Sequence, residues 1–297
     1  MSDTPKLFVT GATGQLGGLV IDALLETVPA RSIVAGVRQP AHAAAAALRE
    51  KGVETRIADY ARPETLASAL AGIDRLLLIS GNEVGQRPQQ HRNVITAAKD
   101  AGVGLIAYTS ILRADTSALF LAKEHRDTEA ALAQSGVPFV LLRNGWYTEV
   151  YALRIPQALR SGTLVGAAGD GRISSAARAD YARAAATVLA GEDHAGRIYE
   201  LAGDESFSLA EFALALAEAS GVPIVYKNVP QDDLRQAALA AGVPEVFAMV
   251  MADTDAGVAK GALLENGRHL SRLIGRPTTP FRDTVKEQVR SMSQSRL

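Results

Sequence analysis

A glycine-rich turn near the N-terminus constrains what this chain can fold into more than any other stretch. The turn, Gly11–Gly17 (GATGQLG), follows the apolar run Leu7–Thr10 and leads into Leu16–Leu25, where apolar residues recur at helical spacing. A glycine turn between a buried strand and a helix lets the backbone approach an anion closely, and it directs free N–H groups and the positive helix end toward that anion. The pattern therefore predicts a nucleotide site at the start of the chain.

Each glycine of this turn has an expected role. We expect Gly11 to permit the tight turn, Gly14 to leave room for a pyrophosphate and Gly17 to let the helix pack near the strand. The spacing G-x-x-G-x-x-G differs from the commonest dinucleotide fingerprint, and a glycine triplet alone is also compatible with a structural turn. The flanking strand and helix favour the nucleotide site. Its predicted cofactor-binding residues are Gly11, Ala12, Thr13, Gly14, Gln15 and Leu16.

Strand-like and helix-like runs alternate from Lys6 to Arg143. The strand candidates are continuous apolar runs, as expected when helices cover both faces of a parallel sheet. They are Leu7–Thr10, Ile33–Val37, Glu54–Ile57, Leu76–Ile79, Leu105–Thr109 and Phe139–Leu142. The helix candidates between them include Ala41–Lys51, Pro63–Leu70, Gln90–Ala101 and Lys123–Ser135. This alternation predicts an α/β fold, a Rossmann-like doubly wound parallel sheet with ligands beyond the carboxyl ends of its strands.

The regular alternation of strand-like and helix-like runs ends after Tyr147. The smaller elements and longer loops that follow predict a smaller α/β C-terminal lobe. We place the NAD(P)-binding domain at residues 1–147 and a substrate-binding lobe at 148–297, with chain exchange between the two. The elements expected in the second half are the helices Arg178–Ala190, Leu209–Ser220, Gln231–Ala241 and Pro244–Ala252 and the strands Arg197–Leu201 and Ile224–Asn228. The polar end, Arg290–Leu297, is expected to be a frayed tail.

Composition narrows the class of protein. With 297 residues, 47% hydrophobic and 21% charged, the chain matches an ordinary globular protein. A net charge of −1 gives no overall attraction to nucleic acid or anionic lipid, and the absence of cysteine excludes disulfides, thiolate catalysis and cysteine metal sites. The sequence shows no secretion signal and no apolar run of membrane-spanning length, so we expect a cytoplasmic protein without nucleic-acid, membrane or metal partners. The oligomeric state is open, and a homodimer is one alternative.

The end of the second strand indicates which dinucleotide binds. Folds that prefer NAD usually place Asp or Glu there, where it accepts from the ribose 2′-OH. Here Ile33–Val37 is followed by Arg38, and no acidic residue occurs between Glu26 and Glu50. Because a guanidinium offers charge-assisted hydrogen bonds to a 2′-phosphate, we predict NADPH as cofactor, against the alternative of a solvated surface arginine. Asp59 and Tyr60, just after the third strand, are candidate contacts to the adenine, against the alternative of a simple loop.

The usual catalytic pair of a short-chain dehydrogenase, Tyr-x-x-x-Lys, is missing after the fifth strand. Aligning the glutamate that often follows the lysine on Glu129 puts His125 in the lysine position and Leu121 in the tyrosine position. Reduction of a simple ketone leaves an alkoxide, whose conjugate acid has a pKa of about 16, whereas a quinone leaves a phenolate, with a pKa of about 10. Because of this difference of about six pKa units, the phenolate needs about 8 kcal/mol less stabilisation than the alkoxide. A quinone-like acceptor, or no chemistry at all, is therefore favoured.

Long stretches of the chain carry a resemblance to a known family. They are LFVTGATGQL (Leu7–Leu16), EVGQRPQQHRN (Glu83–Asn93), AYTS (Ala107–Ser110), LLRNGWY (Leu141–Tyr147), RADYA (Arg178–Ala182) and LSRLIGRPTT (Leu270–Thr279). These stretches closely resemble the bacterial NAD(P)H:quinone oxidoreductase 2 group, an NmrA-like atypical short-chain dehydrogenase family, and the likeness covers almost the whole chain. The resemblance implies a cytosolic enzyme that passes a hydride from NADPH directly to a small-molecule quinone without a flavin.

The resemblance also implies site residues beyond the glycine turn and Arg38. The further cofactor contacts would come from segments after the fourth and sixth strands, namely Asn82, Glu83, Val84, Asn144, Gly145, Trp146, Tyr147, Thr148 and Glu149. Asn144 can offer its amide to the nicotinamide carboxamide or to a quinone oxygen. Trp146 and Tyr147 can stack on a flat ring, although buried aromatic residues more often belong to a core. Asn144, Tyr147 and His125 are the predicted catalytic residues.

Several interpretations stay open. The family often has Asn where this chain has Val150, which bears on how the acceptor is held. His125 is either a donor to the nicotinamide ribose or the acceptor oxygen, or a helix-surface histidine near the site. His91 belongs to the helix after Pro88, with either a structural or a functional role. A second hypothesis for the whole protein is an NmrA-like redox sensor that binds NADP(H) without catalysis and reports to a protein partner.

Overall fold

The computed structural model describes residues 4–294, which form two compact units. Unit 1 comprises the chain up to Ala114 together with Lys123–Asn144 and Ala179–Glu200. Unit 2 comprises Asp115–Ala122, Gly145–Arg178 and the chain from Leu201 onward. The domain division proposed from the sequence, at Tyr147, stays a prediction.

Unit 1 is built on a seven-stranded, mostly parallel sheet with the strand order β3-β2-β1-β4-β5-β6-β8. Its strands are β1 (Leu7–Val9), β2 (Ile33–Val37), β3 (Glu54–Ile57), β4 (Arg75–Leu78), β5 (Leu105–Ile111), β6 (Phe139–Asn144) and β8 (Ile198–Leu201). Parallel pairing sets Phe8 of β1 beside Val34 and Leu76, and Ile111 of β5 beside Asn144 of β6. The carboxyl ends of these strands therefore share one edge of the sheet.

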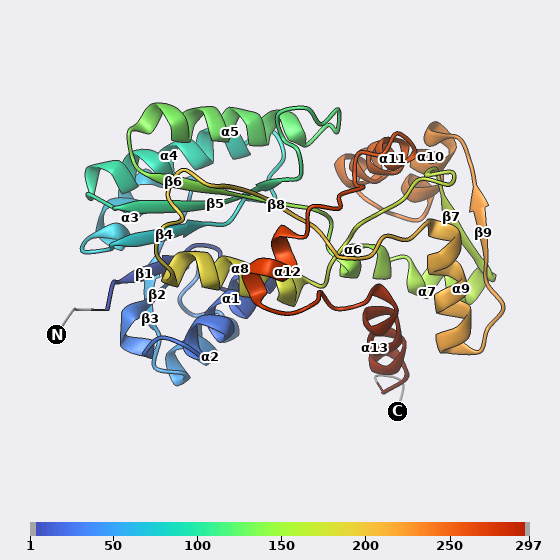
Figure 1. Cartoon of the computed structure of the whole chain (residues 1–297), viewed down its shortest axis with the longest axis horizontal. Coiled ribbons are helices and arrows are strands. Elements are labelled where there is room, and N and C mark those ends of the chain that lie inside the picture. Colours follow the sequence, from blue (N-terminus) through green and yellow to red (C-terminus); the bar gives the residue numbers. More distant parts are fainter. Residues whose placement is uncertain (1–3, 295–297) are drawn as a thin grey trace. The chain divides into compact units, whose positions relative to one another are not determined.

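Helices cover both faces of this sheet (Figure 1). On one face lie α3 (Pro63–Leu70), α4 (Arg87–Asp100) and α5 (Ala122–Ser135); on the other lie α1 (Gln15–Leu25), α2 (Ala43–Glu50) and α8 (Arg178–Ala190). Every residue of β1, β2 and β5 is buried. Phe8, Leu76 and Tyr108 join Leu66 and Val94 in one continuous core. The predicted doubly wound α/β fold is confirmed.

Unit 2 is the smaller α/β part of the fold. It pairs β7 (Thr163–Gly166) with β9 (Val225–Asn228) in a two-stranded parallel sheet. Its helices are α6 (Thr148–Ala152), α7 (Ile155–Ser161), α9 (Leu209–Ser220), α10 (Gln231–Ala240), α11 (Glu245–Ala259), α12 (His269–Ile274) and α13 (Phe281–Gln294). Aromatic rings form its centre: Phe207 stacks on Phe281 with ring centroids 4.3 Å apart, and Tyr151 packs edge-on against Phe207.

Several elements of unit 2 differ from the sequence prediction. The strand β7 and the short helices α6, α7 and α12 were not predicted, and α11 continues past the expected end at Ala252 to Ala259. The prediction of a frayed tail from Arg290 onward is wrong for the described residues, because α13 runs to Gln294. Residues 295–297 lie outside the described residues. The helix is anchored by Phe281 and Val285, one turn apart and both buried. None of the helices within residues 4–294 combines the length and the apolar character needed to span a membrane.

Candidate functional site

The carboxyl edge of the unit 1 sheet collects the polar segments that the sequence singled out. The strand order brings the ends of neighbouring strands into a row. In that row stand Asp59 after β3, Arg38 after β2, the glycine turn after β1, Ser80–Glu83 after β4 and Asn144 at the end of β6. Parallel α/β sheets bind ligands in this place, where loops diverge beyond the strand ends. The topology thus explains why residues far apart in the chain gather at one edge.

The glycine turn has the backbone geometry that its sequence predicts. Gly11 adopts a left-handed conformation, with φ of 57°, and its carbonyl oxygen accepts a hydrogen bond of 2.9 Å from the Gly14 N–H. A Cβ on Gly17 would lie 2.3 Å from that oxygen, so only glycine lets α1 start this close to the turn. Gly14 precedes α1, and no side chain caps the helix. Its first N–H groups thus face a position suited to an anion.

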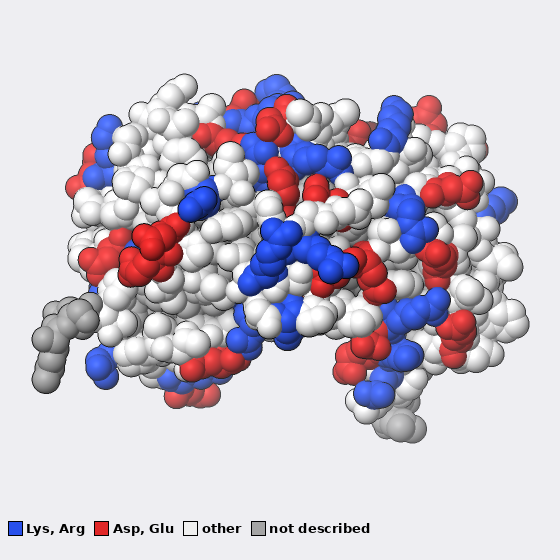
Figure 2. Space-filling model, in the orientation of Figure 1, with Lys and Arg blue, Asp and Glu red and all other residues white. Residues whose placement is uncertain are grey.

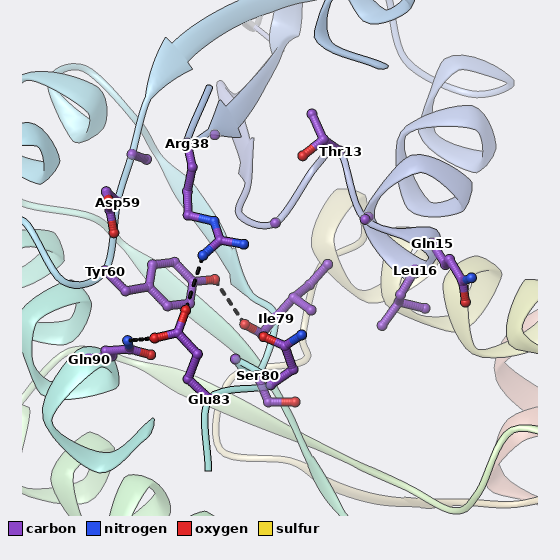
Figure 3. Close-up of a pocket in the computed structure, with 17 residues that line it drawn as sticks. Thr13, Gln15, Leu16, Arg38, Asp59, Tyr60, Ile79, Ser80, Glu83 and Gln90 are labelled. Atoms are coloured by element: carbon purple, nitrogen blue, oxygen red, sulfur yellow. Dashed lines mark hydrogen bonds and ion pairs between the residues drawn. The ribbon is translucent and has the colours of Figure 1, made fainter. Parts of the chain in front are cut away.

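A cleft of about 410 Å³ opens in front of this turn (Figure 3). Most of the predicted cofactor residues of unit 1 line it: Gly11, Thr13, Gly14, Gln15, Leu16, Arg38, Asp59, Asn82 and Glu83. Two do not. Ala12 is buried, 1% exposed, and the Val84 N–H turns back to the Asn82 carbonyl oxygen at 3.1 Å. The structure therefore brings most of the predicted set to one cavity.

The cation predicted to hold a 2′-phosphate has an anionic partner in the cleft. Arg38 Nη1 lies 3.0 Å from Glu83 Oε1, and the two side chains point toward one another in Figure 3. The other carboxylate oxygen of Glu83 accepts a hydrogen bond of 2.7 Å from Gln90 Nε2. The Asp59 carboxylate instead accepts a hydrogen bond of 3.0 Å from the Ala61 N–H, within its own loop.

Tyr60, expected with Asp59 near the adenine, lines the cleft and donates its hydroxyl hydrogen to the Ile79 carbonyl oxygen at 2.9 Å. Sequence reasoning missed other residues that build the cleft, among them Gln90, which reaches it from α4. Thr10 ties the ends of β1 and β4 together, because its hydroxyl accepts from the Ile79 N–H at 2.9 Å. Thr109 of β5 accepts from the Ser80 N–H at 2.8 Å. The signal available for Ser80 was its place directly after β4.

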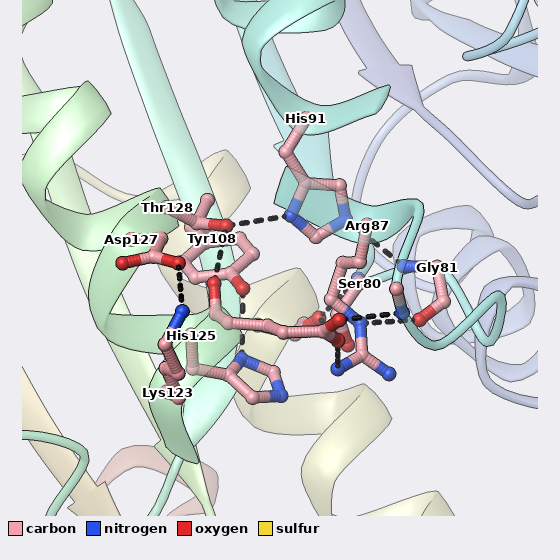
Figure 4. A network of polar contacts seen from close by, with 12 residues as sticks. Ser80, Gly81, Arg87, His91, Tyr108, Lys123, His125, Asp127 and Thr128 are labelled. Carbon is pink, nitrogen blue, oxygen red and sulfur yellow. Dashed lines mark hydrogen bonds and ion pairs between the residues drawn. The ribbon is translucent and has the colours of Figure 1, made fainter. Parts of the chain in front are cut away.

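Buried side chains fasten both ends of the loop that carries Asn82 and Glu83 (Figure 4). At its start, the Gly81 N–H donates to His91 Nε2 at 3.0 Å and its carbonyl oxygen accepts from Arg87 Nε at 2.7 Å. At its end, the Gly85 N–H donates to Glu124 at 2.6 Å. Arg87 and Glu124 form an ion pair of 2.7 Å with 6% and 13% exposed side chains. The loop is therefore held by groups from α4 and α5.

The protonation of His91 follows from this geometry. Burial lowers the pKa of His91 to about 3, and the Arg87 charge acts in the same direction. The neutral ring accepts from Gly81 at Nε2, so its proton sits on Nδ1 and is donated to Thr128 Oγ1, 3.0 Å away. His91 is thus a structural acceptor beneath the cleft loop.

His125 forms a second buried pair, with Tyr108 of β5. Its Nδ1 lies 2.8 Å from the Tyr108 hydroxyl, which leaves Nε2 as the ring atom available to a ligand. Burial lowers the pKa of His125 well below 6.5, with Arg87 and His91 adding to the effect, and burial raises the pKa of the Tyr108 hydroxyl above 10. Both groups are therefore neutral near pH 7.

Asn144 is a buried polar residue with an unmatched acceptor. The residue is 7% exposed, and its Oδ1 has no hydrogen-bond partner within residues 4–294. Burying an amide oxygen without a partner is costly, so such an atom indicates a ligand group that donates to it. The backbone is fixed, because the Asn144 carbonyl oxygen accepts from the Leu112 N–H at 2.9 Å.

The predicted segment after Asn144 belongs to unit 2, where it runs beside Ser174–Arg178. Tyr147 forms a parallel bridge with Ala176, and the Arg178 guanidinium lies over its ring, 4.8 Å from the centroid. The Thr148 hydroxyl pairs with Ser175 at 2.8 Å, and Glu149 accepts from the Arg178 N–H at 2.9 Å. The remaining members of this segment are Gly145, which is buried, Trp146, which is half-buried, and Val150, which is 36% exposed. Their part in cofactor binding stays a prediction.

Comparison with known proteins identifies relatives along nearly the full chain. A family model described as NAD(P)H-binding matches residues 11–192. The chain is 52% identical over 277 residues to Quinone oxidoreductase 2 of Escherichia coli (strain K12), which covers 93% of this chain and 96% of that protein.

Two solved structures share the whole fold. A crystal structure of an NADPH-dependent quinone oxidoreductase from Escherichia coli, complexed with NADPH, is 52% identical and matches with a TM-score of 0.92 over 95% of this chain and 99% of that one. The triphenylmethane reductase of Citrobacter sp., complexed with NADP(H), is 41% identical, with a TM-score of 0.89 over 95% and 99% of the two chains.

Proposed function

This chain belongs to the NAD(P)H-binding family that includes quinone oxidoreductase 2, and we propose that it is an NADPH-dependent quinone reductase. The reaction is a direct two-electron transfer to a small-molecule quinone without a flavin. One observation carries this proposal. The unit 1 cleft joins an uncapped helix start to a cationic Arg38. The sequence agrees with this choice, because no Tyr-x-x-x-Lys pair follows β5 and the alignment on Glu129 puts Leu121 at the tyrosine position. Such a site binds a phosphorylated dinucleotide and suits an acceptor that needs no strong acid.

The residues present fit NADPH. The turn and α1 lie so close together at Gly17 that a side chain would not fit there. With glycine at this position, the backbone of the turn can approach a pyrophosphate. Arg38 offers a guanidinium to the 2′-phosphate, and the buried Oδ1 of Asn144 offers an acceptor to the carboxamide N–H of the nicotinamide. When bound, NADPH supplies the hydride that the quinone accepts.

The protein's own part in the chemistry is binding, orientation and a neutral hydrogen bond. When the Tyr108 hydroxyl donates to His125 Nδ1, the histidine proton sits on Nε2 and can be donated to a ribose or acceptor oxygen. The phenolate-like oxygen of a reduced quinone is about six pKa units less basic than an alkoxide, so such a hydrogen bond suffices and water completes the protonation. We therefore propose His125 as a contact and not as a proton source.

The acceptor side of the proposal rests on Tyr147, which presents an aromatic ring whose face is shared with Arg178. The amide nitrogen of Asn144 is the group of that residue that can donate to a quinone oxygen. A flat quinone is suited to an aromatic neighbour. The family's asparagine is Val150 here, so we propose that this chain holds its acceptor with one polar contact fewer. We also propose a cytosolic location, which the sequence resemblance implies, and a homodimer stays one alternative for the oligomeric state.

The function is tested by following NADPH oxidation at 340 nm (the assay wavelength) after adding a benzoquinone to the purified protein. Replacing Arg38 with Ala removes a charged hydrogen bond worth about 1.5–3 kcal/mol, so the KM for NADPH should rise by about 10- to 100-fold. The KM for NADH should change by less than about twofold, since NADH lacks the 2′-phosphate. Arg62→Ala is the matched control, because Arg62 is an exposed arginine of unit 1 that does not line the cleft. NADPH binding without any quinone-dependent turnover would refute the reductase and favour the sensor.

A further inference from the structure

If NADPH binds as proposed above, its 2′-phosphate and the Glu83 carboxylate are two anions that both interact with the Arg38 guanidinium. Arg38 and Glu83 both line the cavity, with Nη1 and Oε1 3.0 Å apart. Within residues 4–294, Glu83 is the one carboxylate that pairs with Arg38. The nearby Asp59 accepts from the Ala61 N–H instead. A 2′-phosphate held by Arg38 would therefore share its guanidinium with a fixed negative charge.

Glu83 is built into this position and does not merely lie near it. Gln90, whose side chain is buried and 6% exposed as a residue, donates Nε2 to the second carboxylate oxygen at 2.7 Å. The loop on either side of Glu83 is anchored, at Gly81 by His91 and at Gly85 by Glu124. A surface glutamate that paired with Arg38 by chance would not need a buried amide and two fixed loop ends.

The ion pair itself is weak enough to be exchanged. The side chains of Arg38 and Glu83 are 65% and 45% exposed, and pairs with this exposure contribute little to stability. A phosphate with a charge of about −1.5 to −2 offers the guanidinium stronger and bidentate hydrogen bonds. Arg38 can thus turn to the phosphate while Gln90 keeps the Glu83 carboxylate in the cleft.

We propose that Glu83 is a specificity-determining residue that competes with the 2′-phosphate for Arg38 and so narrows the preference for NADPH over NADH. For NADPH, the carboxylate repels the phosphate across the shared guanidinium. For NADH, there is no phosphate to repel, and a carboxylate near the second strand is a group that can accept from the ribose 2′-OH. The same residue therefore weakens the binding of one cofactor and spares the other.

The expected size follows from Coulomb's law. Two anions on either side of one guanidinium lie roughly 6 Å apart, and in an exposed cleft this repulsion corresponds to about three- to tenfold in affinity. Because both groups are exposed, salt should screen the effect.

The experiment is calorimetric titration of the full chain with NADP⁺ and, separately, NAD⁺, for the wild type, Glu83→Gln and Glu64→Gln. Glu64 is the matched control, since it is an exposed unit 1 glutamate paired with Arg62 at 2.9 Å and does not line the cleft. Glu83→Gln should lower the Kd for NADP⁺ by about three- to tenfold at about 0.05 M salt, and by less at about 0.5 M. The Kd for NAD⁺ should not fall, and Glu64→Gln should change neither value. Glu83→Ala, checked by circular dichroism, is a second variant expected to act in the same direction.

The outcomes separate this inference from the proposed function. If the wild type binds NADP⁺ and reduces a quinone but Glu83→Gln leaves the ratio of the two Kd values unchanged, the competition is refuted and the reductase stands. Weaker NADP⁺ binding by Glu83→Gln would also overturn it, because the carboxylate would then support Arg38 instead of competing. If the wild type binds neither dinucleotide, the proposed function itself fails.

Discussion

Gly17 and Gly18, adjacent residues of α1, provide a matched pair of substitutions that tests the geometry of the glycine turn. A Cβ on Gly17 would lie 2.3 Å from the Gly11 carbonyl oxygen and 2.8 Å from the Ala12 Cα. A Cβ on Gly18 would meet the Ala12 carbonyl oxygen at 3.9 Å, an ordinary contact. Because the atoms that crowd Gly17 belong to the backbone, α1 must move away from the turn by about 1 Å to accept alanine there.

The two substitutions should change stability in opposite directions. Alanine in place of a helical glycine contributes about 1 kcal/mol at either position. Gly18→Ala should keep that gain, whereas at Gly17 the overpacking costs about 3 kcal/mol and leaves a net loss of about 2 kcal/mol. Unit 1 is of a size for which each kcal/mol corresponds to about 2–4 °C. The melting temperature should therefore rise by about 2–4 °C for Gly18→Ala and fall by about 4–8 °C for Gly17→Ala.

Binding of NADP⁺ provides the second measurement of this pair. A shift of α1 takes its first N–H groups away from the position of the pyrophosphate, and a lost charge-assisted hydrogen bond is worth about 1.5–3 kcal/mol. The Kd of Gly17→Ala, measured by calorimetry below its melting temperature, should rise by about 10- to 100-fold, and that of Gly18→Ala should stay within about twofold. Equal melting temperatures and equal Kd values for the two variants would show that the turn tolerates a Cβ and that this reasoning is wrong.

Two further predictions concern buried charges and histidines. Asp255 is fully buried, and its carboxylate accepts from Arg154 Nη2 at 2.7 Å and from Nη1 at 2.9 Å. Arg154→Met should therefore destabilise unit 2 by about 3–5 kcal/mol in urea unfolding, while Arg154→Met with Asp255→Leu should recover most of the loss. The pKa of His91 is about 3 in the folded chain, below its unfolded value of about 6.5. Between these pH values the unfolded chain binds a proton that the folded chain does not. The free energy of unfolding should therefore fall by about 1.4 kcal/mol for each unit by which the pH is lowered. His125 acts in the same direction, and His91→Gln, which keeps an acceptor for Gly81, should lose less stability than the wild type between pH 7 and 5; an unchanged loss would contradict the neutral His91.

Local sequence patterns predicted the elements that carry their own start and stop signals. The helix α9 was predicted at its observed limits, and the structure shows why they are sharp: Ser208 and Glu211 form a capping box at its start and Gly221 ends it in a left-handed conformation. The strand β2 was likewise predicted at its limits, from a continuous apolar run, and the structure buries all five of its residues. The strand β7 has only four residues and takes its partner from β9, far along the chain, so no local pattern indicated it.

The candidate site divides in the same way. Its cleft residues were predictable because the ends of parallel strands share one edge, which places Arg38 and Asn82 near the glycine turn without any knowledge of side chains. The side-chain pairings were not predictable. Arg38 and Glu83 stand 45 positions apart, and nothing in either segment indicates that one neutralises the other. The segment from Gly145 to Glu149 was recognised from family resemblance, and its bonds to Ser175 and Arg178 join residues about 30 positions apart.

The ion pair between Arg87 and Glu124 is best interpreted through the loop that it holds. A buried ion pair contributes little to stability, because removing two charges from water costs about as much as their attraction returns. Its other contacts are more informative: Arg87 binds the Gly81 carbonyl oxygen and Glu124 binds the Gly85 N–H, so the pair fixes the two ends of the segment that presents Glu83. Free of these contacts, an acidic side chain would swing away from an arriving phosphate. We therefore interpret the pair as a positioning device, which keeps the Glu83 carboxylate beside Arg38 when a second anion enters the cleft.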